Sequence, residues 1–216
     1  MDNLIYVLFI CIVAPLTMML FLLTGKSKQL VGFMLAGICI SLFISELNTV
    51  LLRFFSDSVA YVTTTITPIS EEIVKAVPVL VYVFLCSDDR NRLLPISFAV
   101  GIGFAMFENV VILVQNIENV SIGWAVIRGV STALMHGVCT MSVGYGMSFI
   151  RKKKKLFICG TFALLSLAVI YHGIFNMLVQ SDTRALGLAL PAVTFIPLLL
   201  RQKKYQRKTK RDKPKG

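Results

Sequence analysis

The chain has 216 residues, of which 56% are hydrophobic and only 15% are charged, and its mean hydropathy is +0.78. A soluble domain of this size carries about 25% charged residues, so the composition excludes an ordinary soluble enzyme. The net charge of +11 is explained below by membrane topology, and we expect no nucleic-acid partner.

Apolar segments close to 20 residues long recur along the whole chain, and each is long enough to cross the hydrocarbon core of a bilayer. They predict an all-α, polytopic membrane bundle of about seven transmembrane helices. The expected helices are Asn3–Leu23, Leu30–Leu52, Ile66–Cys86, Leu93–Gln115, Ile122–Ile150, Leu156–Val179 and Leu186–Leu200. We expect a single transmembrane domain over residues 1–200. A disordered basic tail should follow over 201–216, because that segment is polar and lacks apolar periodicity.

The positions of the 22 lysine and arginine residues predict the orientation of these helices. If the N-terminus is outside, most of them fall in the inside connections, in the run Arg151–Lys155 and in the tail, whereas the outside loops hold only Arg53 and Arg184. The positive-inside rule then predicts a multi-pass protein of the cell membrane with its N-terminus outside and its C-terminus inside. The cytoplasmic tail can also contact anionic lipid headgroups.

A few ionisable side chains interrupt the expected spans, and they come from four different helices. They are Glu71, Glu72 and Lys75 in the third span, Glu108 in the fourth, His136 in the fifth and His172 in the sixth. At a rise of 1.5 Å per residue, the acids and imidazoles of all four helices lie about 9–12 Å from the outer ends of their spans. Ionised groups inside a bilayer cost several kcal/mol each, so such a layer is typical of a functional site.

The spacing within the third span adds detail. Lys75 lies three residues after Glu72 and four after Glu71, so it can pair with either carboxylate on one helix face. The two glutamates are about 100° apart around the helix. We therefore expect one of them to face the site and the other to support it or Lys75.

This set of side chains suits the hydrolysis of an amide bond. A carboxylate can take a proton from water, and imidazoles with an amide can stabilise an oxyanion. The same groups can instead bind a divalent metal such as zinc. The candidate catalytic residues are Glu71, Glu72, Glu108, His136 and His172, with Lys75, Asn109 and Asn176 in support. If a metal is present, its candidate ligands are Glu72, Glu108, His136 and His172.

Four sequence blocks, each on its own helix and in this order, resemble the PrsW intramembrane proteases. They are "EEIVK" (71–75), "GFAMFEN" (103–109), "RGVSTALMHG" (128–137) and "YHGIFN" (171–176), within the core region 69–178. The wider superfamily includes the CAAX prenyl endopeptidases and bacteriocin-processing enzymes. Compared with its general pattern, Lys75 replaces a later arginine and Glu108 stands where a histidine stands, as in PrsW-like members.

The resemblance implies a glutamate-type or metal-dependent intramembrane protease. It implies that Glu71 or Glu72 is the general base, that Glu108 and His136 complete the water-binding site, and that His172 acts with Asn176 on the oxyanion. It also implies a membrane-anchored protein substrate, similar to an anti-sigma factor, which is cut on its extracytoplasmic side.

Two other classes of protein are compatible with the sequence. A proton- or ion-coupled transporter would use membrane Glu and His residues as a relay, but we find no inverted repeat of the kind many transporters have. A catalytically inactive member of the protease fold would normally lack one of the site residues, and this chain has them all.

Overall fold

The structure, a computed structural model, describes residues 2–55, 58–119 and 121–211, and within them it contains helices and no strand. The α-helices are α1 (Asp2–Leu22), α2 (Gly25–Phe54), α3 (Val59–Tyr61), α4 (Thr67–Leu85), α5 (Arg90–Gln115), α6 (Ile122–Met147), α7 (Thr161–Val179) and α8 (Arg184–Arg211). A π-helical turn, Val62–Ile66, joins α3 to α4, a second one, Leu156–Gly160, precedes α7, and a 3₁₀ turn, Ile117–Asn119, follows α5. Because α3, the first π turn and α4 are continuous, the described chain forms seven long helical segments. The all-α fold is thus confirmed.

Four helical segments are long and apolar enough to cross a membrane: Leu4–Leu22, Gly25–Phe54, Arg90–Gln115 and Leu156–Val179. The apolar part of α8, Arg184–Leu198, is shorter. Helix α4 carries Glu71, Glu72 and Lys75 within its 19 residues, which lowers its hydropathy. The chain is therefore a membrane protein with several candidate spans, while the count of seven spans and their orientation remain predictions.

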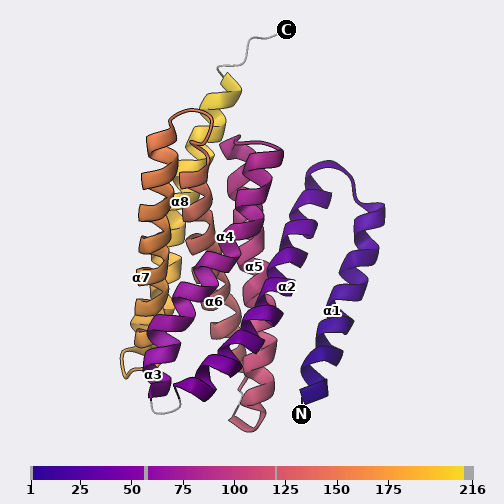
Figure 1. The fold of residues 1–216 in the computed structure, drawn as a ribbon, viewed down its shortest axis with the longest axis vertical. Helices are drawn as coiled ribbons and strands as arrows, with labels where there is room; N and C mark the ends of the chain where they lie inside the picture. Colours follow the sequence, from indigo (N-terminus) through magenta and orange to yellow (C-terminus); the bar gives the residue numbers. More distant parts are fainter. Residues whose placement is uncertain (1, 56–57, 120, 212–216) are drawn as a thin grey trace.

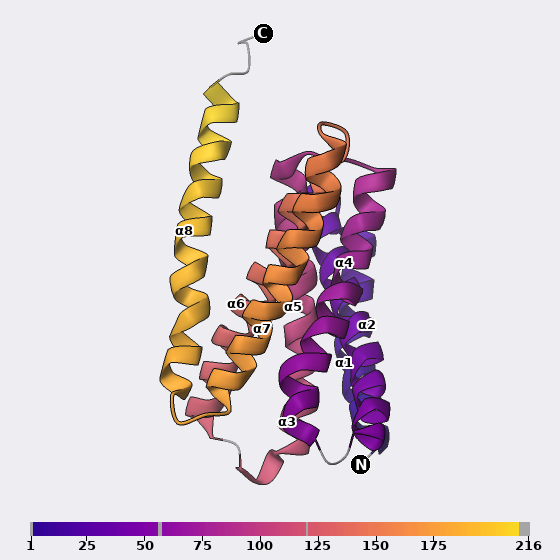
Figure 2. The same ribbon diagram turned by 60° about the vertical axis from the view of Figure 1, so that its left-hand side comes forward.

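Successive helices run in alternating directions, so their connections gather at two ends of the bundle. The α1–α2, α4–α5 and α6–α7 connections and the C-terminal end of α8 lie at one end, and the N-terminus and the other connections lie at the opposite end (Figure 1). Helix α4 contacts α2, α5, α6 and α7. Helix α1 packs at one edge of the bundle on α2 and α5, and α8 packs at another edge on α6 and α7 (Figure 2).

Helix α4 has its polar face toward the protein and its apolar face outward. Its exposed stripe consists of Ile69, Ile73, Val77 and Val81, which recur every four residues. The opposite face is buried and includes all three ionisable residues of the helix. This inverted amphipathic pattern fits a helix that faces lipid on one side and a polar site on the other.

Close contact between helix backbones brings the site residues together. A Cβ atom at Gly101 of α5 would fall against the main-chain oxygen of His136 in α6. A Cβ atom at Gly173 of α7 would lie 2.6 Å from the main-chain oxygen of Thr64 in the first π turn. Small residues at such positions allow membrane helices to approach closely. A Cβ atom at Gly129 of α6, by contrast, would have no such neighbour within 4 Å among the described residues.

The basic tail differs from the expectation of disorder after residue 200. Helix α8 continues to Arg211, and residues 212–216 lie outside the described part of the chain. Between Pro197 and Arg211 the sequence contains no glycine or proline, and leucine, lysine, arginine and glutamine are good helix formers. The low apolar content of residues 201–211 therefore did not mark the end of the helix.

Candidate active site

Helix α4 contributes three ionisable side chains to the interior of the bundle. Pro68 is the second residue of this helix and follows the π-helical turn Val62–Ile66 directly. One turn further on, Glu71, Glu72 and Lys75 are all buried, with exposed fractions of 2% or less. Their burial requires partners, because an unpaired charge in a low-dielectric interior is costly.

Glu72 and Lys75 form an ion pair, and each of them also contacts one histidine. Lys75 Nζ lies 2.6 Å from Glu72 Oε1 and 2.7 Å from His136 Nδ1. Glu72 Oε1 also lies 2.9 Å from His172 Nδ1. The two imidazole rings meet edge to face, with 4.9 Å between their centroids. The Lys75 ammonium packs over the ring of Phe104, 4.6 Å from its centroid.

The chemistry of the donors fixes where the imidazole protons lie. An ammonium group can only donate, so His136 Nδ1 accepts from Lys75 and the proton of a neutral ring is on Nε2. That Nε2–H then donates to Glu108 Oε2, 2.9 Å away. His172 Nδ1–H donates to Glu72, which leaves its Nε2 as an acceptor. Each histidine is thus oriented by one carboxylate.

Glu71 differs from Glu72 in its surroundings. Its Oε2 lies 3.8 Å from His172 Nε2 and 4.0 Å from His136 Nδ1. This buried oxygen has no hydrogen-bond partner among the described residues, and neither has Glu72 Oε2. The difference is that Glu72 Oε1 is bound by both Lys75 and His172. An acceptor oxygen that faces an acceptor nitrogen across about 4 Å leaves a position for a third atom between them. That third atom must be a hydrogen-bond donor or a cation.

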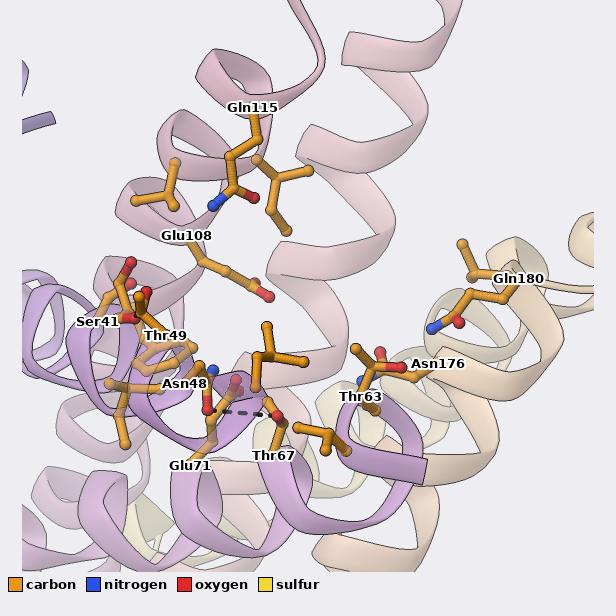
Figure 3. A pocket seen from close by; sticks show the side chains of 18 of the residues that line it. Ser41, Asn48, Thr49, Thr63, Thr67, Glu71, Glu108, Gln115, Asn176 and Gln180 are labelled. Carbon is orange, nitrogen blue, oxygen red and sulfur yellow. Dashed lines mark hydrogen bonds between the residues drawn. The ribbon is translucent and has the colours of Figure 1, made fainter. Parts of the chain in front are cut away.

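A cavity of about 270 Å³ leads to Glu71 from one end of the bundle. Glu71 and Glu108 reach into it from α4 and α5, and Asn176 lies on the α7 side (Figure 3). Gln115 and Gln180, at the ends of α5 and α7, also line it. The two histidines lie behind Glu71, since neither lines the cavity. Water can therefore meet Glu71 before it meets either imidazole.

The arrangement fits a bound metal ion. Glu71, His136 and His172 each offer one donor atom, and the three atoms lie within 4.8 Å of one another. Two histidines and one glutamate are a ligand set found in zinc peptidases. The carboxylates of Glu72 and Glu108 accept from the other ring nitrogens, as expected around metal-binding histidines.

This grouping differs in part from the metal ligands suggested by the sequence, which included Glu72 and Glu108. In the structure Glu71 takes the place next to both imidazoles, while Glu72 is occupied by Lys75 and His172. A cation in this position would compete with the Lys75 ammonium for His136 Nδ1.

The supporting residues fall into two groups. Asn176 lines the cavity, and its Nδ2 donates to the main-chain oxygen of Thr63 in the π turn, 2.9 Å away. Asn109 does not line the cavity. Its buried Oδ1 has no hydrogen-bond partner in the described part of the chain. The structure thus brings Asn176, but not Asn109, to the candidate site.

Two features of the site were missed in the sequence. Arg128 has its Nη2 3.7 Å from Glu108 Oε1 and lines the cavity. Helix α2 contributes a polar wall that consists of Ser41, Ser45, Asn48 and Thr49. Polar residues repeated at helical spacing within an apolar span could have indicated this wall.

A buried set of carboxylates and imidazoles at the end of a cavity, inside a bundle of apolar helices, is consistent with the active site of a membrane-embedded hydrolase. Comparison with known families agrees. The chain belongs to the PrsW family of intramembrane metalloproteases, whose family model, described as "PrsW family intramembrane metalloprotease", matches residues 26–201. A search of curated proteins and a search of solved structures each found no match. The match confirms the resemblance and extends it beyond residues 69–178 to include α2.

Proposed function

We propose that this intramembrane protease hydrolyses a peptide bond of a membrane-anchored protein near the extracytoplasmic leaflet, and that Glu71 is the carboxylate that acts on the water. The observation that carries the proposal is the Oε2 atom of Glu71, which is buried, lies within 4.0 Å of both histidines and lacks a hydrogen-bond partner among the residues that the structure describes. A carboxylate in this state can accept a proton from a water that reaches it through the cavity.

The surrounding residues have distinct roles in this proposal. His172 Nε2 and Glu71 Oε2 are 3.8 Å apart and together hold the water. Glu72 fixes the His172 ring through Nδ1. Glu108 fixes His136 in the same way through Nε2. Because these bonds set ring orientation before the substrate arrives, the site does not need to reorganise during the reaction.

A divalent ion held by Glu71, His136 and His172 would supply Lewis-acid polarisation of the scissile carbonyl. With Glu71 engaged in this way, Glu108 is the second carboxylate in the cavity that can accept a proton. Asn176 uses one amide N–H for the Thr63 main-chain oxygen. Its second N–H is left for the oxyanion that forms on the substrate.

The end of the bundle at which the cavity opens determines the leaflet. Gln115 and Gln180 place the opening at the end that carries the α5–α6 and α7–α8 connections. The positive-inside rule assigns this end to the outside. In a cysteine-free background, Asp182→Cys should react with a membrane-impermeant maleimide in intact cells and Lys153→Cys should not. The reverse labelling would contradict the outer-leaflet site.

The substrate class follows from the position of the site. A cavity that begins at the outer end of the bundle and stops at Glu71 can receive a peptide segment just outside or just within the outer leaflet. A single-span protein with an extracytoplasmic domain, such as an anti-sigma factor, presents such a segment.

The test is cleavage of a panel of single-span membrane proteins by the purified, reconstituted protein. Glu71→Gln and His172→Ala should abolish cleavage. The matched control is Glu46→Gln, which removes an acid that accepts from Tyr6 Oη at 2.6 Å and lies outside the cavity. A chelator should abolish cleavage, and zinc should restore it, only if an ion is part of the site. Full cleavage by Glu71→Gln would overturn the proposal.

A further inference from the structure

A second cavity, of about 520 Å³, lies among α5, α6, α7 and α8 and shares no lining residue with the first. One part of its wall is apolar and consists of Leu94, Met141, Leu164 and Leu198. The other part is polar and consists of Arg90, Ser142, Tyr145 and Arg201. The cavity therefore has an amphipathic wall that the catalytic site does not use.

The two guanidinium groups reach the cavity from different helices. Arg90 begins α5, and its Cζ lies 4.3 Å from the ring centroid of Tyr145 and 5.5 Å from that of Phe149. These cation–π contacts hold the guanidinium against the end of α6. Arg201 comes from α8 on another side of the cavity.

The cavity lies toward the end of the bundle at which basic residues gather. The α4–α5 and α6–α7 connections and the C-terminal end of α8 all lie there (Figure 1). Toward this end α8 diverges from α7 (Figure 2). In a bilayer, a space between diverging helices faces acyl chains, and its charged end lies at the level of the headgroups.

From this geometry we infer that the second cavity binds one anionic phospholipid, with its phosphate near Arg90 and Arg201 and part of an acyl chain along the apolar wall. Guanidinium groups bind phosphate oxygens through paired N–H donors. The inference concerns residues within the bundle rather than the basic tail, and it does not depend on the proposed proteolysis.

The chemistry of the wall favours a lipid over a transmembrane segment of a substrate as the occupant. Two guanidinium groups, of Arg90 and Arg201, stand beside an apolar wall. This pairing matches a phosphate headgroup with its acyl chain, whereas an apolar membrane helix would offer the guanidinium groups no acceptor.

The test is native mass spectrometry of the full chain in detergent, titrated with phosphatidylglycerol or with phosphatidylcholine. We expect one retained phosphatidylglycerol. Arg201→Gln should lower its affinity about five-fold, since one basic residue near a headgroup contributes about 1 kcal/mol. Lys203→Gln removes the same charge from the same helix but lies outside the cavity wall, and it should have a smaller effect.

A change of shape without a change of charge provides a second test. Leu164→Trp fills the apolar part of the cavity from α7 and should reduce phosphatidylglycerol retention, with unchanged helix content by circular dichroism. Equal retention of both lipids, or equal effects of Arg201→Gln and Lys203→Gln, would overturn the inference. Displacement of the lipid by millimolar inorganic phosphate would also overturn it, because the site would then recognise a free anion.

Discussion

The difference between Glu71 and Glu72 can be tested through stability, without knowledge of the substrate. Glu72→Gln keeps the shape of the side chain but removes the charge that lies 2.6 Å from the Lys75 ammonium. Lys75 has no exposed surface, so its charge would remain buried without a carboxylate in contact. Breaking a buried ion pair in this way costs about 3–5 kcal/mol, which corresponds to a fall of roughly 6–20 °C in the unfolding midpoint for a chain of this length.

Cys139 provides an assay for this prediction. It is the buried cysteine of the chain, the other four being exposed. Its Sγ lies 3.6 Å from the main-chain oxygen of Ala168 in α7. With the exposed cysteines replaced by serine, a thiol-reactive fluorophore should label Cys139 only when α6 and α7 separate. The temperature of half-maximal labelling then reports the unfolding midpoint.

Two comparisons make this experiment decisive. Glu71→Gln leaves the Glu72–Lys75 pair intact and removes the charge of a buried carboxylate whose Oε2 has no hydrogen-bond partner in the described part of the chain, so its midpoint should stay the same or rise. The double variant Glu72→Gln with Lys75→Met removes both charges and should regain most of the loss. Equal midpoints for Glu71→Gln and Glu72→Gln, or a double variant as unstable as Glu72→Gln alone, would refute the reasoning.

Two further predictions concern helix packing and metal binding. Gly101→Ala should lower the free energy of unfolding by about 1–3 kcal/mol through overpacking, and with it the unfolding midpoint, because the new methyl group meets the main-chain oxygen of His136. Gly129→Ala, which meets no atom within 4 Å, should not, and an equal effect of the two would contradict the packing described here. Lys75→Met should bind zinc about tenfold or more tightly, because it removes a cation 2.7 Å from His136 Nδ1. Competition with a fluorescent chelator measures this change, and unchanged or weaker binding would argue against a metal ion beside His136.

Much of the fold follows from the sequence because hydrophobic length is a strong signal in membrane proteins. The seven expected segments correspond to the seven helical segments of the described chain. Most of their ends differ by five residues or fewer, but α8 continues to Arg211, well past the expected end at Leu200. The sequence also predicted similar depths for Glu108 and His136, and the contact between Glu108 on α5 and His136 on α6 agrees with those depths. Depth is a one-dimensional quantity, and the rise per residue determines it.

The roles of the two adjacent glutamates could not be obtained in this way, because they depend on the rotation of α4 and on its neighbours. The exposed stripe from Ile69 to Val81 gives part of the answer. On a helix with 3.6 residues per turn, Lys75 lies about 180° from the centre of this stripe, with Glu71 about 40° to one side and Glu72 about 60° to the other. Both acids thus point inward, but only the positions of α6 and α7 decide which meets Lys75 and which meets both imidazoles.

The energetics of α4 connect this asymmetry to function. Each ionised residue at the centre of a membrane helix costs about 2.5–3.5 kcal/mol on insertion scales, and α4 carries three such residues. Lys75 and Glu72 offset much of their cost through their contact of 2.6 Å and their bonds to the histidines. Glu71 Oε2 has no such bond. Glu72 Oε2 also lacks a hydrogen-bond partner in the described part of the chain, but the Glu72 carboxylate is paired with Lys75. Much of the unmet cost therefore lies on Glu71 Oε2, which is within 4.0 Å of both imidazoles. A water that donates to Glu71 Oε2, or a cation that coordinates it, would offset this cost. Burial of Glu71 in α4 therefore favours a bound water or cation at the site.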